Sequence, residues 1–146
     1  MKKTILWICI GLWIAFIFFN SLQSGVVSSA TSGRVAQLII SFLEWLGMEP
    51  NPETVSLFVR KGAHVGEFFI LASLLVFQEI PNAPTQFNRF VRIFIYTLTV
   101  AIADEVIQTA IPGRAGLIDD VGIDMIGATI AALGVWIIPK RGKLPQ

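Results

Sequence analysis

The stretch VSLFVRKGAHVGEFFILASLLVF, from Val55 to Phe77, decides the fold class. It is apolar over most of its length, and about 20 such residues are enough for a helix to cross the hydrocarbon core of a membrane. Its charged residues and the one histidine of the chain all lie in its first half, at Arg60, Lys61, His64 and Glu67. A helix formed by this stretch therefore has one apolar end and one end that carries titratable side chains.

Three further apolar runs accompany this stretch. Together the four runs predict membrane helices at about residues 4–20, 55–78, 91–111 and 120–138. The bulky apolar residues of the first run favour a retained signal-anchor helix over a cleaved signal peptide. Pro139 follows the last run and ends it, because proline cannot continue a helix.

The composition agrees with a membrane protein. Of the 146 residues, 54% are hydrophobic and only 14% are charged, and the mean hydropathy is +0.71. This excludes disorder and argues against a soluble globular enzyme, in which about 25% of residues are charged. The length predicts a single domain over residues 1–146. Cys9 is the only cysteine, which excludes internal disulfides and cysteine-based metal sites.

A shorter amphipathic pattern lies between the first two predicted membrane helices. Ser32 is a candidate N-cap, apolar residues follow at spacings of three and four, and Gly47 is a candidate stop. This predicts a helix over about residues 33–46, which is too short to span and is expected in the outer interface. The predicted fold class is therefore all-α: a polytopic membrane helix bundle with four transmembrane helices plus an extracytoplasmic interfacial amphipathic helix.

The distribution of Lys and Arg predicts the orientation, because short loops rich in these residues stay in the cytoplasm. With the N-terminus inside, the cytoplasmic set is Lys2, Lys3, Arg89, Arg92, Lys140, Arg141 and Lys143. The outer set is smaller and consists of Arg34, Arg60, Lys61 and Arg114. Both termini are therefore expected in the cytoplasm. On this topology Glu79 is the only acid inside, so the net charge of +1 conceals a positive inner side and a negative outer side.

Polar residues of the predicted membrane helices gather at one depth. Arg60, His64 and Glu67 are spaced i, i+4 and i+7, which places them on one stripe of a helix. Because successive helices alternate in direction, the polar halves of the last three meet at the outer leaflet. Ionisable residues inside a membrane are costly when unpaired, so they mark a candidate site. The candidate ligand-binding residues are Lys61, His64, Glu67, Asp104, Glu105, Gln108, Arg114, Asp120 and Asp124.

Two further expectations concern the surroundings of this site. The short loop 111–118 places Arg114 above the carboxylates as a covering cation, whereas Arg60 is expected to extend to lipid head groups. Close helix packing is expected at four small residues, which are Gly62, Gly66, Ala128 and Ala132.

At these positions the chain resembles the VanZ-like family of small bacterial membrane proteins. The matching pieces are Lys61-Gly-Ala-His64, Asp104-Glu105-Val-Ile-Gln108, Pro112-Gly113-Arg114 and Asp120-Val-Gly-Ile-Asp124-Met-Ile-Gly127. Glu67 and Asp124 stand where the family commonly has an aromatic residue and an asparagine. The resemblance implies a protein of the bacterial inner membrane that acts in the cell envelope. The family's founding member is linked to low-level resistance to the glycopeptide teicoplanin.

Several functions are open at this point. The first is a binding site for an envelope component, such as a lipid-linked cell-wall precursor or a glycopeptide antibiotic. Lys61, His64 and Arg114 would then hold phosphate or carboxylate groups, and the acids would hold amines or a divalent cation. Another is a structural polar network without a ligand. A carrier is less favoured, because paired broken helices are absent from the sequence pattern.

The remaining alternative is a metal-dependent intramembrane hydrolase or transferase that acts on a lipid-linked phosphate. Its candidate cofactor is a divalent cation, Mg²⁺ or Ca²⁺, and its candidate catalytic residues are His64, Glu105 and Asp120. No H-E-x-x-H or G-x-S-x-G spacing occurs, so whether the chain is an enzyme stays open. Membrane lipids are expected partners and nucleic acid is not.

Overall fold

The computed structural model describes residues 2–78, 85–114 and 116–138. Within these ranges the chain forms helices and no strand, which confirms the all-α class. The elements are α1 (Lys2–Ser21), α2 (Gly25–Trp45), α3 (Pro52–Gln78), α4 (Gln86–Thr109), α5 (Ile118–Ala132) and the 3₁₀ helix η1 (Leu133–Trp136). Five residues used in the sequence argument lie outside the described ranges, namely Glu79, Pro139, Lys140, Arg141 and Lys143.

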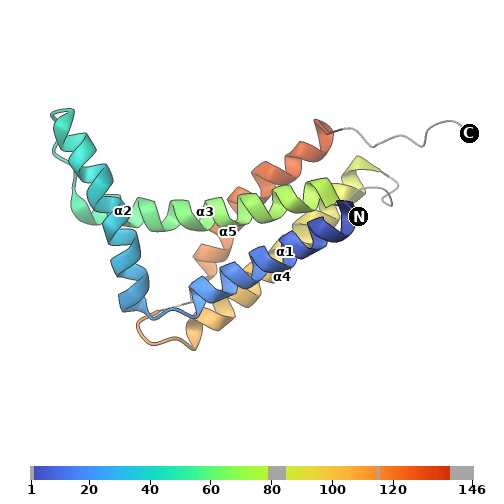
Figure 1. Cartoon of the computed structure of the whole chain (residues 1–146), viewed down its shortest axis with the longest axis horizontal. Helices are drawn as coiled ribbons and strands as arrows, with labels where there is room; N and C mark the ends of the chain where they lie inside the picture. The colour runs from blue at the N-terminus through green and yellow to red at the C-terminus, as the bar shows by residue number, and fades with distance from the viewer. Residues whose placement is uncertain (1, 79–84, 115, 139–146) are drawn as a thin grey trace, which may run out of the picture.

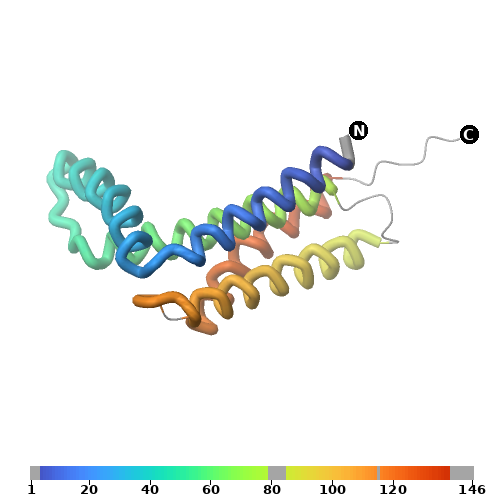
Figure 2. Tube along the Cα trace, turned by 60° about the horizontal axis from the view of Figure 1, so that its bottom comes forward, coloured from blue at the N-terminus to red at the C-terminus, as the bar shows by residue number. Residues whose placement is uncertain are grey.

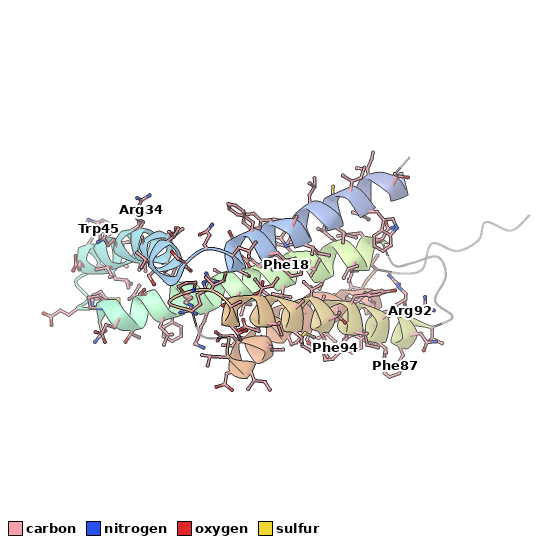
Figure 3. All side chains as sticks on the ribbon, turned by 90° about the horizontal axis from the view of Figure 1, so that it is seen from below. Phe18, Arg34, Trp45, Phe87, Arg92 and Phe94 are labelled. Carbon is pink, nitrogen blue, oxygen red and sulfur yellow. The ribbon has the colours of Figure 1, made fainter. Side chains whose placement is uncertain are left out.

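Helix α3 is the centre of the arrangement, because it packs against α1, α2, α4 and α5. In Figures 1 and 2, α1 and α4 run alongside α3, and α2 leans away at one end of the molecule. The beginnings of α1 and α4 and the end of α3 lie together at the opposite end. Figure 3 shows the same polarity through Arg34 and Trp45 on α2, which lie far from Phe87 and Arg92 on α4.

The contact between α3 and α5 depends on a glycine. A Cβ atom at Gly127 would lie 2.0 Å from the backbone oxygen of Val65, so the two helices approach closely only because this side chain is absent. Ala128 and Ala132 are each 1% exposed beside it, which confirms the expected close packing on this helix. The same expectation for the glycines of α3, Gly62 and Gly66, is wrong, because a Cβ atom at either would meet nothing within 4 Å.

Helix α2 begins at Gly25, eight residues earlier than the predicted start at residue 33, so with 21 residues it is not too short to span, contrary to the prediction. The cap is Ser24, whose side chain accepts a hydrogen bond from Val27 N, and not Ser32. Ser32 lies inside the helix and donates to the backbone oxygen of Ser28 at 3.0 Å. Such bonds let hydroxyl residues sit within a helix without an apolar periodicity, which is why the pattern missed this first part. The end is as expected at Gly47, whose φ of 79° only glycine adopts readily.

The predicted starts of α3 at residue 55 and of α4 at residue 91 are late, because these helices begin at Pro52 and Gln86. Helix α3 starts at Pro52, where the Asn51 side chain accepts from the backbone N–H groups of Glu53 and Thr54 at 2.9 and 3.1 Å. The predicted continuous helix 120–138 is wrong in its last part, because α5 ends at Ala132 and η1 follows. Glycine lowers helix stability, and Gly134 lies in this 3₁₀ segment.

Within the residues that the structure describes, two helices are long and apolar enough to cross a membrane. They are α1, over Thr4–Ser21, and α2, over Gly25–Trp45, with mean hydropathies of 2.0 and 1.3. They indicate a membrane protein. By length and apolar composition, the predicted four spans are therefore not confirmed. The described parts of α3 and α4 carry more charged residues than α1 and α2. The 15 residues of α5 rise only about 22 Å.

The molecule exposes apolar side chains along every helix. Leu12, Val26, Phe58, Val106 and Ile118 have exposed fractions of 67%, 80%, 71%, 62% and 87%. Soluble monomers rarely expose large apolar patches, so apolar side chains exposed in this number are suited to contact with lipid. The buried apolar core is smaller and lies between α1, α3, α4 and α5.

A buried arginine closes the end of the bundle where α4 begins. Arg89 is 0% exposed. Its Nη1 donates to Gln86 Oε1 at 2.6 Å and to the Ile138 backbone oxygen at 3.2 Å, and its Nη2 donates to the Val76 backbone oxygen at 3.5 Å. One side chain thus satisfies carbonyl groups near the ends of α3 and η1, where helices leave such groups without partners.

Candidate functional site

A polar pocket lies at the other end of the bundle, where α1 ends and α2 begins. Its volume is about 190 Å³, and α1, α2, α3, α4 and the loop between α4 and α5 surround it. The lining residues are Asn20, Ser21, Gln23, Ser28, Thr31, Ser32, Val35, Val59, Arg60, Ala63, His64, Glu67, Asp104, Gln108 and Arg114. Hydroxyl, amide and charged side chains therefore dominate its wall.

Helix α3 contributes a stripe to this wall. Arg60, His64 and Glu67 all line the pocket, at the i, i+4 and i+7 spacing of one helix face. Glu67 Oε1 accepts a hydrogen bond from Asn20 Nδ2 at 2.8 Å, and the Glu67 backbone oxygen accepts from Trp13 Nε1 at 2.9 Å. Both bonds fix the last turns of α1 against α3 at the depth of the pocket.

A buried hydrogen-bond network forms the floor. His64 Nδ1 lies 3.0 Å from Asp124 Oδ1, which joins α3 to α5. Asp104 accepts from Ser21 Oγ through Oδ1 and from Gln108 Nε2 through Oδ2, the latter at 2.9 Å. Ser21, Asp104, Gln108 and Asp124 are at most 2% exposed. Side chains from four helices thus meet in a place that solvent barely reaches.

Glu105 connects this network to the loop before α5. Its Oε1 accepts from Gln108 Nε2 at 3.3 Å, and its Oε2 accepts from the backbone N–H of Leu117 at 2.9 Å. Gly116 packs on the same turn of α4, because a Cβ atom there would lie 2.4 Å from the Glu105 backbone oxygen. The carboxylate therefore holds the loop against α4 in addition to facing the floor of the site.

Lys61 and Asp120 form an ion pair that does not line the pocket. Lys61 Nζ lies 3.3 Å from Asp120 Oδ1, and the two side chains are 40% and 8% exposed. The pair joins the first half of α3 to the first turn of α5. The pair therefore lies beside the pocket, at the partly exposed edge of the α3–α5 contact.

Arg114, predicted as a covering cation above the carboxylates, lines the pocket together with Asp104 and Glu67. Its Nη2 donates to Ser28 Oγ on α2 at 2.6 Å, and the ion pairs found within the described ranges involve only Lys61 with Asp120 and His64 with Asp124. Burial and the neighbouring Arg60 guanidinium lower the pKa of Arg114, whereas Asp104, Glu105 and Glu67 raise it. Arg60 and Arg114 therefore bring two positive charges to the wall of one pocket.

The nine sequence-predicted site residues separate into a wall, a floor and a flanking pair. His64, Glu67, Asp104, Gln108 and Arg114 line the pocket. Glu105 and Asp124 join the buried network next to it. Lys61 and Asp120 form the pair beside it. All nine thus lie at one end of the bundle, although their role in binding stays a prediction.

Sequence reasoning missed a group of lining residues. Arg60 was assigned to lipid head groups although its spacing to His64 and Glu67 placed it on the same stripe. Ser28 and Thr31 carried no signal, because the start of α2 was not predicted.

The floor also has the composition of a metal site. His64, Asp104, Glu105 and Asp124 each offer one nitrogen or oxygen atom, and these atoms lie within 4.8 Å of one another. Carboxylates and an imidazole at this separation are able to bind a divalent cation or to share protons.

Comparisons with known proteins place the chain in a family. No curated protein and no solved structure matches the chain. A family model described as VanZ/LLP1 matches residues 6–139, a range that includes all five α-helices almost completely. This range holds the pocket, the buried network and the Lys61–Asp120 pair. The chain therefore belongs to the VanZ/LLP1 family.

Proposed function

We propose that the chain is a polytopic membrane protein whose pocket opens to the outer leaflet and binds the anionic headgroup of an amphipathic cell-envelope component. In this topology α1, α3, α4 and the segment from α5 through η1 span the membrane, α2 lies in the outer interface, and both termini are cytoplasmic. The direction of the helices supports it, because the start of α1 and the end of η1 lie at the end of the bundle opposite to the pocket.

The observation that carries the proposal is the pair of arginines at the pocket. Arg60 and Arg114 both line it, and both are absent from the ion pairs formed within the described ranges. Two guanidinium groups that repel each other are stabilised by an anion between them, and phosphate or carboxylate accepts several of their N–H groups at once. Ser28 Oγ, which accepts from Arg114, keeps its own proton to donate on the α2 side, whereas the Thr31 and Ser32 hydroxyls donate to backbone oxygens of α2.

The size of the pocket restricts the ligand. At about 190 Å³ it is smaller than the ~300–1,000 Å³ of pockets that enclose a drug-sized molecule. It therefore takes a headgroup, with the apolar part of the ligand left against the exposed surface of the helices. A lipid-linked phosphate fits this description, and so does one acidic portion of a glycopeptide antibiotic.

Direct binding tests this function. Purified protein in detergent is titrated with dihexanoyl phosphatidic acid by calorimetry, with dihexanoyl phosphatidylcholine as the comparison lipid. Arg60→Gln and Arg114→Gln should each weaken binding about tenfold to a hundredfold, because a hydrogen bond to a charged group contributes ~1.5–3 kcal/mol. Arg34→Gln, an exposed arginine of α2 outside the pocket, is the matched control and should bind normally. Equal affinity of all three variants and the wild type would overturn the proposal.

An accessory role in glycopeptide resistance is part of the proposal and has its own readout. Susceptible bacteria that express the chain should tolerate more teicoplanin than cells that express Arg114→Gln at the same level. The measurement is the minimal inhibitory concentration, and immunoblotting of membranes checks the level. Identical values for the two strains would separate this role from headgroup binding.

A further inference from the structure

We propose that the buried cluster of His64, Asp104, Glu105, Asp124 and Gln108 binds one divalent cation, for which Mn²⁺ is the best match. The cluster shares His64, Asp104 and Gln108 with the wall of the pocket. The inference deepens the proposed function, because a cation at the floor would add to the attraction for an anionic headgroup. Binding of the cation itself requires no headgroup.

The ligand atoms of the cluster are close enough together to share one ion. The four ligand atoms of His64, Asp104, Glu105 and Asp124 come from α3, α4 and α5 and lie within 4.8 Å of one another. Oxygen ligands lie ~2.0–2.6 Å from Mg²⁺ or Ca²⁺, so two ligands on opposite sides of one ion are about 4–5 Å apart. The observed separation therefore matches a single shared ion.

Two buried oxygen atoms of the cluster lack hydrogen-bond partners in the described part of the chain, which independently indicates a ligand. Gln108 Oε1 and Asp124 Oδ2 are inaccessible and have no hydrogen-bond partner among the residues that the structure describes. Both residues are 0% exposed. The amide of Gln108 cannot be exchanged end for end, because its Nε2 donates to Asp104 and Glu105 and an oxygen there would face two carboxylates. What both atoms lack is a donor or a cation.

The cluster also carries more negative than positive groups. Three carboxylates of the cluster face one imidazole, while Lys61 is paired with Asp120 and Arg114 donates to Ser28. Buried negative charge of this kind is costly unless a cation or protons neutralise it. A bound cation neutralises it and also occupies the lone pairs of Gln108 Oε1 and Asp124 Oδ2, which shared protons between carboxylates do not do.

The donor set favours one class of ion. Oxygen ligands from carboxylates and an amide suit Mg²⁺, Ca²⁺ and Mn²⁺, whereas an imidazole ligand suits transition metals. Mn²⁺ accepts both kinds of ligand. The sequence-based candidates Mg²⁺ and Ca²⁺ lack this preference for the nitrogen of His64, so we expect them to bind more weakly than Mn²⁺.

Electron paramagnetic resonance tests the inference, because free Mn²⁺ in water gives a sharp six-line signal that binding broadens. The full chain in detergent is treated with a chelator, exchanged into metal-free buffer and titrated with MnCl₂. We expect one Mn²⁺ per chain. Asp124→Asn and Gln108→Leu should weaken binding at least tenfold, and Asp119→Asn, an exposed acid next to Asp120 on α5, should leave it unchanged. The inference fails if the wild type leaves the free signal undiminished.

Thermal unfolding separates the loss of a ligand from the loss of the fold. The wild type and Asp119→Asn should unfold at a higher temperature with Mn²⁺ than with chelator, whereas Asp124→Asn should keep its metal-free unfolding temperature and lose the metal-dependent increase. The inference is overturned if Asp124→Asn retains the full increase. The arginine variants keep the two proposals apart: Arg60→Gln with Arg114→Gln should abolish phosphatidic acid binding and still take up one Mn²⁺.

Discussion

Asp120 is a buried carboxylate whose cation is half exposed. Its pair with Lys61 has an N–O distance of 3.3 Å, and the lysine side chain is 40% exposed. Screening by solvent at the lysine reduces the energy of such a pair. The pair is therefore expected to add modestly to the stability of the α3–α5 contact.

A double-mutant cycle measures this pair. Lys61→Met and Asp120→Asn, alone and combined, are compared by thermal unfolding in one detergent. We expect a coupling free energy of about 1 kcal/mol, because the pair is partly exposed. Lys61→Met should destabilise more than Asp120→Asn, since it leaves a buried carboxylate without its cation. Additive effects of the two substitutions would contradict the pairing.

At the residue scale, the sequence predicted which residues share a helix face better than it predicted which residues form hydrogen bonds with each other. The spacing of His64 and Glu67 placed both on one face, and both line the pocket. It did not predict that Arg114 would donate to Ser28, because that bond depends on a helix start that lacks apolar periodicity. Hydrogen bonds between distant segments follow from tertiary packing, which helical spacing does not encode.

At the scale of the elements, the α3–α5 contact depends on the size of one side chain. Gly127→Ala would place a methyl group 2.0 Å from the Val65 backbone oxygen, so the helices must separate. We expect a loss of about 3 kcal/mol of unfolding free energy, at the upper end of overpacking effects. The measurement is unfolding in a denaturing detergent.

Gly122→Ala is the matched control for this prediction, since it lies on the same helix and its added Cβ atom would meet nothing within 4 Å. Removing a helical glycine at an open position should stabilise by up to about 1 kcal/mol. Equal stability of the two alanine variants would show that the close approach at Gly127 does not hold the helices together.

The junction between α2 and the Arg114 loop is a second close contact. Gly25 N donates to the Pro112 backbone oxygen at 3.1 Å, and a Cβ atom at Gly25 would lie 2.0 Å from the Gly113 oxygen. Gly25→Ala should therefore displace the loop and weaken phosphatidic acid binding about tenfold, while Gly33→Ala on the same helix has open space and should bind as the wild type does. Calorimetry measures the affinity of both variants. Unchanged binding by Gly25→Ala would refute the link between this contact and headgroup binding.

Element boundaries were predictable where a cap and an apolar pattern coincide. Gly47 marks the end of α2, as expected, whereas Asn51 caps α3 at Pro52, three residues before the start that the apolar run predicted. The start of α2 was missed because hydroxyl residues such as Thr31 satisfy themselves on the preceding turn, where Thr31 Oγ1 donates to the Val27 oxygen at 3.0 Å. The apolar spacing that predicted the later part of α2 begins only after Ser32, so it could not locate a helix start at Gly25.

At the scale of the whole molecule, the proposed topology predicts which end reacts with a reagent that cannot cross membranes. Cysteines are introduced at Glu49, in the exposed segment between α2 and α3, and at Phe87, which is 64% exposed at the start of α4. In intact spheroplasts Glu49→Cys should react with a charged maleimide, whereas Phe87→Cys should react only after permeabilisation. The reverse pattern would invert the orientation. Cys9 is replaced by serine in both variants, because it is exposed too.

The buried charges also give the molecule an electric polarity along its axis. Arg89 lies in the first turn of α4, and Asp104 lies fifteen residues later on the same helix, about 22 Å away along its axis. Moving one unit charge across a membrane potential of 100 mV changes its free energy by ~2.3 kcal/mol. With the inside negative, the potential favours the arginine end inward and the carboxylate end outward, which is the proposed orientation. A cation that enters the cluster from outside moves part of the way down this voltage, so its occupancy should rise when the membrane is energised.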